Sequence, residues 1–201
     1  MDTPTETFAV MFVCTGNICR SAVAEQVFRA DYAGLPITFS SAGTAALVGS
    51  GMPIEAATIS LERHGLPEQH AGRQLDKALV ESSDLVIALT REHRSEIVRT
   101  LPRANRFTFT LREMAILLES AASDDDFVLK REPGDSLVTV LKKAIPAIAA
   151  ERAYATHPAD PNDYDVIDPF RRSQDIYDQM AEEIDDARRR IEQSLRILAT
   201  K

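Results

Sequence analysis

Residues 13–21 bring a cysteine and an arginine together in a short segment that could catalyse phosphoryl transfer. The apolar run 8–13 before it predicts a buried strand, and residues 22–32 after it predict a helix. A loop between a strand and the amino terminus of a helix directs backbone N–H groups into a hollow that suits a tetrahedral oxyanion. The sequence therefore predicts an anion-binding loop that begins with a thiol and ends with a guanidinium.

The side chains of this loop fit such a task. Cys14 stands at the strand end, where the helix dipole, the N–H donors and Arg20 stabilise a thiolate, which is the nucleophilic form. Arg20 can hold two phosphoryl oxygens with its planar fork, and Ser21 can donate a hydrogen bond to the thiolate. Gly16 and Asn17 readily adopt the positive φ of a tight turn. We predict Cys14 as the nucleophile and, as phosphate-binding residues, Thr15, Gly16, Asn17, Ile18, Cys19, Arg20 and Ser21.

The rest of the chain must supply the elements that position this loop. Apolar runs predict strands, and helical periodicity alternates with them. Such alternation predicts an α/β fold with a small four-stranded parallel sheet and helices on both faces. Ligands of these sheets bind beyond the carboxyl ends of the strands, where Cys14 lies. The predicted strands are 8–13, 37–41, 85–89 and 106–110, and the predicted helices are 22–32, 54–61, one from 75, 92–101, 111–118, 137–153 and 176–198.

Four segments resemble the low-molecular-weight protein-tyrosine phosphatase family, especially its bacterial members. Residues 14–21 match the family signature Cys-x-Gly-Asn-x-Cys-Arg-Ser. Ser41-Ala42-Gly43 resembles the second-strand motif, and residues 83–90 resemble the third strand. Asp168-Pro169-Phe170 matches the late Asp-Pro-aromatic motif. The resemblance covers most of the chain except a stretch near 112–162, and it implies the Rossmann-like phosphatase fold.

This resemblance implies roles for residues outside the loop. Asp168 would be the general acid that protonates the leaving group and then the base that activates water; Asp163 and Asp165 are nearby rivals that lack the Pro-aromatic sequel. His70 would hold Asn17 and Ser21 by hydrogen bonds. Cys19 would form a reversible disulfide with Cys14 that protects the nucleophile, although it could also simply pack. Leu47 and Phe170 would line the substrate wall.

Three reactions are compatible with these motifs. The first is hydrolysis of phosphotyrosine in proteins through a cysteinyl phosphate. The second is hydrolysis of phosphoarginine, since Asp168-Pro169-Phe170 also resembles bacterial protein-arginine phosphatases, but those have threonine where this chain has Ile18. The third is arsenate reduction with an external thiol, because related proteins bind arsenate with the same loop. Ile18 favours phosphotyrosine.

Composition limits the partners that we expect. The chain has 201 residues and a formal net charge of −8, so nucleic acid and anionic membranes are not expected partners. Its two cysteines both lie in the loop, and no histidine spacing indicates zinc. We expect no metal or cofactor, no membrane insertion, a cytoplasmic location, and a phosphorylated protein substrate, for which a bacterial tyrosine kinase is one candidate.

We expect a single phosphatase domain over residues 1–201 with a helical insertion at about 112–162, before the general-acid loop. This stretch is longer than in typical family members. It could cap the active site, form a dimer contact, bind a partner, or be a peripheral helical hairpin. The oligomeric state does not follow from the sequence.

Overall fold

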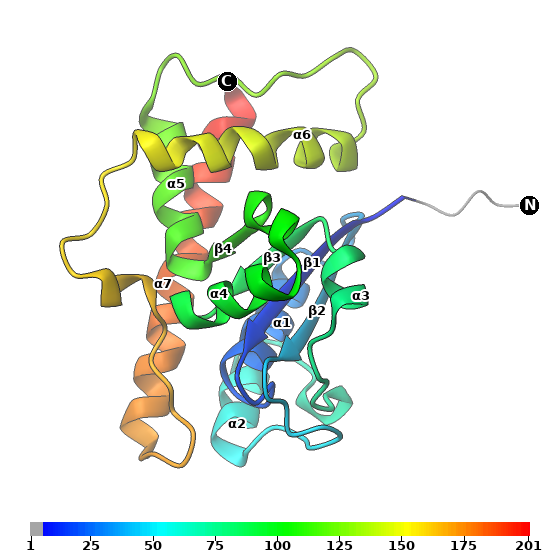
Figure 1. Ribbon diagram of the computed structural model, residues 1–201, viewed down its shortest axis with the longest axis vertical. Helices are drawn as coiled ribbons and strands as arrows, with labels where there is room; N and C mark the ends of the chain where they lie inside the picture. The colour runs from blue at the N-terminus through cyan, green and yellow to red at the C-terminus, as the bar shows by residue number, and fades with distance from the viewer. Residues whose placement is uncertain (1–5) are drawn as a thin grey trace, which may run out of the picture.

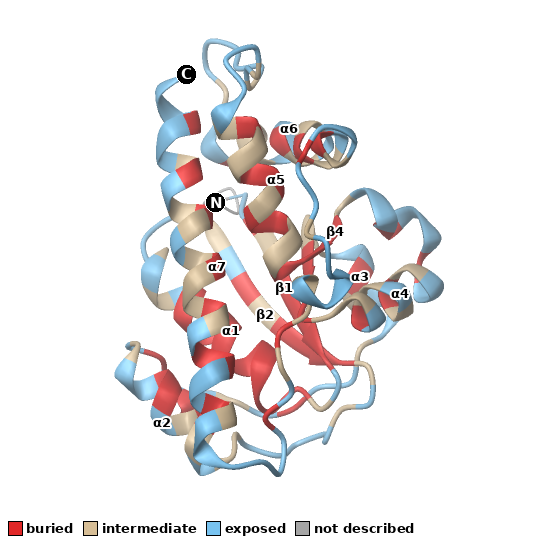
Figure 2. Cartoon of the chain, turned by 90° about the vertical axis from the view of Figure 1, so that its left-hand side faces the viewer, coloured by how far each residue is buried: buried red, intermediate tan, exposed pale blue. Residues whose placement is uncertain are grey.

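Strand β1 (Phe8–Cys14) is the central element of the sheet in the computed structural model, which describes residues 6–201 (Figure 1). Its apolar residues are buried on both faces (Figure 2), as expected of a parallel strand covered by helices. The four strands are parallel and ordered β2-β1-β3-β4, which confirms the predicted fold class. The others are β2 (Ile37–Gly43), β3 (Leu85–Ala88) and β4 (Thr108–Thr110).

Helices cover both faces of this sheet. Phe12 belongs to the larger core, together with buried residues of α1 (Arg20–Asp31), α5 (Leu111–Ser123) and α7 (Gln174–Thr200). Its neighbours Met11 and Val13 point to the other face. There they pack with residues of α3 (Lys77–Glu81) and α4 (Arg91–Thr100). Helix α2 (Ile54–Glu62) packs against α1 and α7.

Helix α7 confirms the predicted long amphipathic helix. Its apolar stripe is buried and its opposite face is exposed (Figure 2), and it packs mainly against α5. The buried positions are Tyr177, Met180, Ala181, Ile184, Ala187, Ile191, Ser194 and Leu198. The helix therefore serves as scaffold for the sheet.

The fourth strand is shorter than predicted. The expected strand began at residue 106, but Pro102 starts a 3₁₀ helix that continues to Arg106. Thr110 ends the strand and caps α5, because its side chain accepts from the N–H of Glu113 while the Glu113 carboxylate accepts from the N–H of Thr110. This capping box turns the strand into the helix without a loop.

Helix α6 (Leu137–Ala150) is the main element of the predicted insertion. It packs on α5 and on the amino-terminal part of β1, and crosses the upper end of the molecule in Figure 1. The carboxyl end of β1, where Cys14 lies, points to the opposite end. Two 3₁₀ turns, Glu151–Ala153 and Pro161–Tyr164, lead the chain back toward that end. Helix α6 thus does not cover the residues around Cys14.

Within the described part of the chain, no helix combines the length and apolarity that a membrane crossing requires.

Candidate active site

The phosphate loop, residues 14–21, connects β1 to α1 and is held against the segment 43–50. The N–H of Ala45 donates to the Thr15 carbonyl oxygen at 3.0 Å. A Cβ at Gly43 would collide with that same carbonyl oxygen, so the close approach of the two segments requires glycine there. The end of the second strand therefore supports the loop directly.

The Cys14 sulfur lies at the base of the loop, where the side chain is 2% exposed. Ser21 Oγ is 2.9 Å from Sγ, and the N–H of Asn17 donates to Sγ at 3.3 Å. Because Ser21 Oγ accepts from Asn17 Nδ2 at 3.0 Å, the hydroxyl proton of Ser21 is free to point at the sulfur. Two donors and the amino terminus of α1 are thus directed at the Cys14 sulfur.

Asn17 connects the loop to the sheet. It adopts φ 55°, a left-handed conformation that asparagine tolerates, and is fully buried. Its Nδ2 donates to Ser21 Oγ and, at 2.7 Å, to Ser41 Oγ, while its Oδ1 accepts from the N–H of Arg73 at 2.8 Å. Every polar atom of this buried amide has a partner, which fixes both its orientation and the direction of the Ser21 proton.

The hydrogen-bond network continues to a buried carboxylate. Ser41 Oγ accepts from Asn17 and donates to Glu25 on α1, and Glu25 is paired with Arg29 one turn later. Glu25 is 8% exposed, so its partners compensate the cost of removing the charge from water. The path Arg29, Glu25, Ser41, Asn17 joins helix α1 to the loop from behind.

His70 contacts the phosphate loop at one point, the backbone of Asn17. Its Nε2 lies 2.6 Å from the backbone oxygen of Asn17, as expected for support of that residue. The hydrogen bond to Ser21, however, comes from the Asn17 side chain. His70 thus contacts the Asn17 backbone, and the Asn17 side chain in turn orients Ser21.

Arg20 and Asp168 form an ion pair beside the loop. Arg20 Nη2 and Asp168 Oδ2 are 3.0 Å apart, and Arg20 Nη1 also donates to the Val166 carbonyl oxygen at 3.4 Å. The arginine side chain is 6% exposed, whereas that of Asp168 is 54% exposed. The guanidinium is therefore fixed in the protein, while the carboxylate stands at the solvent side of the ion pair.

The segment that carries Asp168 is anchored on three sides. Asp165 accepts from the backbone N–H and the guanidinium of Arg91. The N–H of Val166 donates to the Leu89 carbonyl oxygen at 2.8 Å. The N–H of Ile167 donates to the carboxylate of Glu183 on α7. Asp165 is thus occupied as an anchor, which leaves Asp168 as the carboxylate at the loop.

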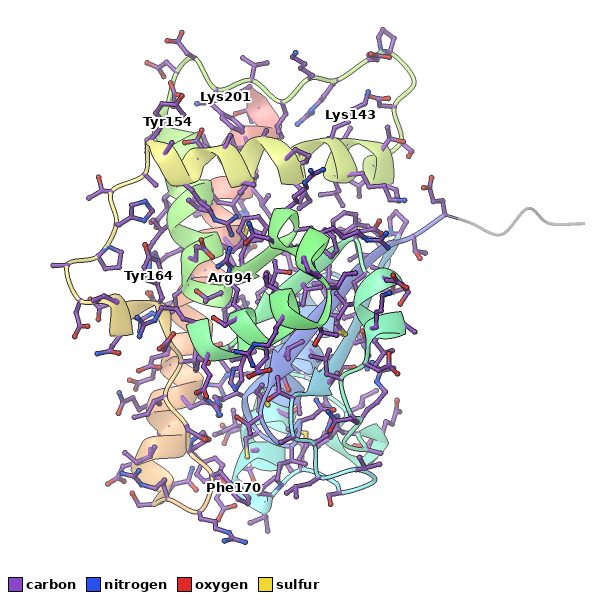
Figure 3. All side chains as sticks on the ribbon, in the orientation of Figure 1. Arg94, Lys143, Tyr154, Tyr164, Phe170 and Lys201 are labelled. Carbon is purple, nitrogen blue, oxygen red and sulfur yellow. The ribbon has the colours of Figure 1, made fainter. Side chains whose placement is uncertain are left out.

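A cleft of about 150 Å³ opens above the sulfur. Asn17, Ser21 and His70 lie outside its lining and support it. Phe170 is 38% exposed, and Figure 3 shows it at the lower end of the molecule, opposite Tyr154 and Lys143 at the upper end. The cleft brings together most of the predicted site residues, since its lining is Cys14, Thr15, Gly16, Ile18, Cys19, Arg20, Ala45, Leu47, Asp168 and Phe170.

The second cysteine has a different environment from the first. Both are free thiols, but Cys19 packs 3.9 Å from the Tyr177 hydroxyl on α7. Burial raises the pKa of the Cys19 thiol to about 12, although the Tyr177 hydrogen bond acts in the opposite direction. Cys19 therefore stays protonated and is a poor nucleophile. The protective disulfide between them stays a prediction.

His93, which the sequence analysis did not identify, is buried directly behind the loop. It lies in the first turn of α4, with Nε2 2.9 Å from Thr15 Oγ1 and Nδ1 2.9 Å from Thr90 Oγ1. Burial, reinforced by the positive charge of Arg20, lowers the pKa of His93 to about 4. A signal was available, because Thr90 and His93 follow the third strand at the same sheet edge as Cys14.

This shifted pKa predicts a loss of stability in mild acid. His93 is neutral in the folded protein but titrates near 6.5 when unfolded, so the unfolded state binds more protons between about pH 6.5 and 4. The contribution of neutral His93 to the free energy of unfolding is fully present above pH 6.5. It falls by up to about 3 kcal/mol as the pH decreases toward 4. Urea unfolding at several pH values measures it. The slope of the unfolding free energy against pH should be smaller in His93→Asn than in the wild-type protein. An unchanged slope would contradict the lowered pKa of His93.

Among residues 6–201, no group of three or more His, Cys, Asp and Glu side chains is arranged to hold a metal ion.

The amino-terminal part of the chain matches a known family. The family model described as low molecular weight phosphotyrosine protein phosphatase matches residues 9–123. The chain is similar to a protein-arginine-phosphatase of Bacillus subtilis (strain 168), with 37% identity over 106 residues that cover 52% of this chain and 70% of the relative. It is also similar to the low molecular weight protein-tyrosine-phosphatase Ptp of Acinetobacter johnsonii, with 33% identity over 103 residues covering 51% and 70%.

Solved structures show the same fold over nearly the whole chain. One is the YwlE arginine phosphatase, determined as a cysteine-to-serine mutant with a phosphorylated active-site serine. It superposes with a TM-score of 0.65 at 27% identity, covering 94% of this chain and 96% of that one. The similarity therefore extends well beyond the loop that holds Cys14.

Proposed function

The chain is a phosphatase of the low-molecular-weight protein-tyrosine phosphatase family, and from that premise we propose that it hydrolyses phosphotyrosine in proteins through a phosphocysteine formed at Cys14. The observation that carries the proposal is the Cys14 sulfur at the base of the cleft, with a hydroxyl and an N–H directed at it. Arg20 and Asp168, whose side chains are 3.0 Å apart, both line the cleft above the sulfur.

The first chemical step transfers the phosphoryl group to sulfur. The Cys14 thiolate attacks phosphorus in line with the tyrosine oxygen, a P–S bond forms and the P–O bond breaks. Arg20 and the N–H groups of the loop hold the three equatorial oxygens as charge develops on them. Protonated Asp168 gives its proton to the departing phenolate. Asp168 must therefore leave Arg20 and turn toward the leaving group when substrate binds.

The second step regenerates the Cys14 thiolate. Asp168, now a carboxylate, takes a proton from a water molecule that attacks the phosphocysteine, and the P–S bond breaks to release inorganic phosphate. Ser21 stabilises the departing thiolate with the hydroxyl proton that Asn17 leaves free. The related arginine phosphatase whose mutant carries phosphate on its active-site serine supports a covalent intermediate at this point of the fold.

The cleft wall favours an aromatic phosphoester. Ile18 is buried and lines the cleft, and Ala45, Leu47 and Phe170 also present apolar surface to it. A tyrosine ring needs apolar contact only, whereas a guanidinium needs acceptors for its N–H groups. Asp168 is the one carboxylate among the cleft residues and is already required for proton transfer.

Phosphoarginine is the second candidate substrate. The observation in its favour is the similarity to protein-arginine-phosphatases of Bacillus subtilis and Geobacillus stearothermophilus, at 37% and 35% identity. The residue that argues against it is Ile18, because the arginine phosphatases that the chain resembles have threonine at that loop position. A single hydroxyl could supply the acceptor that Ile18 lacks.

Parallel assays on phosphotyrosine and phosphoarginine peptides of one sequence test the proposal. We expect the wild-type protein to prefer phosphotyrosine, and Ile18→Thr to shift the ratio of the two kcat/KM values toward phosphoarginine by roughly tenfold, the effect of one or two polar contacts. Ile18→Val is the matched control, because it removes a methyl group without adding an acceptor. A wild-type preference for phosphoarginine would establish the second candidate instead.

We propose further that residues 1–201 form one phosphatase unit in which the insertion is a peripheral helical element. In support, α6 packs on α5 and on β1 at the end opposite the cleft. The residues of α6 that are buried are Val138, Ala144 and Ile148. A protein substrate is then free to approach the cleft from the other end.

A further inference from the structure

His93 is a buried, neutral side chain beside the cleft that the two chemical steps above do not use. It is 4% exposed and lies between two hydroxyl groups. Thr90 caps α4, and Thr15 follows Cys14 in the phosphate loop. Thr15 is itself exposed and lines the cleft. The histidine thus connects the end of β3 to the hydroxyl of a residue that lines the cleft.

The protons in this connection have a preferred direction. Thr90 Oγ1 accepts from the backbone N–H of His93 at 3.2 Å, and its own proton has one acceptor among residues 6–201, the Nδ1 of His93 at 2.9 Å. If Nδ1 accepts, the neutral ring carries its proton on Nε2 and donates it to Thr15 Oγ1 at 2.9 Å. The Thr15 oxygen then accepts from His93, so the hydroxyl proton of Thr15 is not used in this bond and can point into the cleft.

The opposite tautomer satisfies fewer groups. A proton on Nδ1 would give Thr90 Oγ1 a second donor and leave the Thr90 proton without an acceptor among residues 6–201. Thr15 would have to donate inward to Nε2, so that only lone pairs of its oxygen faced an incoming phosphoryl group. Lone pairs toward an anion are repulsive, whereas an O–H toward it is a charge-assisted hydrogen bond.

We propose that His93 is a positioning residue that keeps the Thr15 hydroxyl as a hydrogen-bond donor to the phosphoryl group. The inference rests on the proposed function and adds a side-chain donor to the backbone N–H groups and Arg20. Since the bound oxyanion and the transition state carry their charge on the same oxygens, the donor strengthens phosphate binding as well as turnover.

Two pairs of variants separate this role from simple packing. Thr15→Val keeps the shape and removes the donor, and should lower kcat/KM for phosphotyrosine by roughly tenfold to a hundredfold, the usual effect of a hydrogen bond to a charged group. Thr15→Ser should recover most of that loss. His93→Gln places an amide N–H near the position of Nε2 and should lose little, whereas His93→Asn reaches only the Thr90 side and should lose as much as Thr15→Val.

The combined variant gives the decisive comparison. In the Thr15→Val background, His93→Asn should cause almost no further loss, because the histidine acts through a hydroxyl that is already absent. Additive losses would overturn the proposal, as would equal losses in His93→Asn and His93→Gln, which indicate that His93 only caps and packs. A Thr15→Val protein with wild-type kcat/KM would overturn it even if the His93 variants failed to fold.

Binding of inorganic phosphate keeps the inference separate from the proposed function. Titration calorimetry with phosphate needs no turnover, so it reports on the Thr15 donor even if neither phosphotyrosine nor phosphoarginine is hydrolysed. We expect Thr15→Val and His93→Asn to weaken phosphate binding by similar factors, and Thr15→Ser and His93→Gln to restore most of it. Unchanged phosphate affinity in Thr15→Val would contradict the inference, whatever the substrate proves to be.

Discussion

Replacement of Cys14 by serine should reduce phosphotyrosine hydrolysis by about 10⁴-fold or more, the loss typical of a removed nucleophile. A hydroxyl at this position is far less acidic than a thiol, and the donors from Ser21 and Asn17 do not ionise it at neutral pH. Arg20 and the N–H groups of the loop are unaffected, so the variant should still bind phosphate. Steady-state rates and phosphate titrations on the same preparation measure both quantities.

Cys19→Ser is the matched control for this experiment. It makes the same sulfur-to-oxygen replacement in the same loop. Cys19, however, is a protonated thiol beside Tyr177, with a pKa raised to about 12 by burial. We therefore expect a loss many orders of magnitude smaller than that of Cys14→Ser. Comparable losses in the two variants would contradict the assignment of Cys14 as the nucleophile. Substantial phosphatase activity that copurifies with the Cys14→Ser protein would contradict it as well.

The loop and the sheet could be predicted because their signals are local. Cys14, Gly16, Asn17 and Arg20 are close in sequence, and each has a residue type that the geometry of an anion-binding turn requires. The strands are short apolar runs separated by helical periodicity, and the connection rules leave few arrangements for such a pattern. The strand-end rule then places the loop at the ligand-binding edge without further information.

The supporting residues were harder to predict because they act at a distance. Ser41 and Glu25 meet behind the loop only when β2 lies beside α1, and the motif that contains Ser41 does not indicate a partner on α1. The pairing of Asp165 with Arg91 likewise depends on where the acid loop crosses the end of β3. Long-range polar contacts of this kind follow from tertiary packing, which local patterns do not encode.

The insertion shows a similar limit. Periodicity identified the helix that begins at residue 137, and the structure confirms that start with Ser136 as its cap. The side of the sheet on which it packs could not be derived, because an amphipathic helix fits any apolar surface. The structure places α6 on the amino end of β1, away from the end of the strand that carries Cys14.

The second large effect concerns Asp168, whose removal should depend on the leaving group. Asp168→Asn keeps the size of the side chain but cannot transfer a proton, so hydrolysis of phosphotyrosine should fall by about 10² to 10⁴-fold. The loss should be much smaller for p-nitrophenyl phosphate, because p-nitrophenolate is stable enough to leave without protonation. Parallel rates on the two substrates measure this difference.

Asp163→Asn is the control for Asp168→Asn, since Asp163 is a carboxylate of the same segment that lies outside the cleft lining. It should lose little activity on either ester. Equal losses of Asp168→Asn on both esters would mean that Asp168 acts through its contact with Arg20, by holding the guanidinium in place, and not by proton transfer. The leaving-group dependence therefore distinguishes the two roles that a single aspartate 3.0 Å from the phosphate-binding arginine can have.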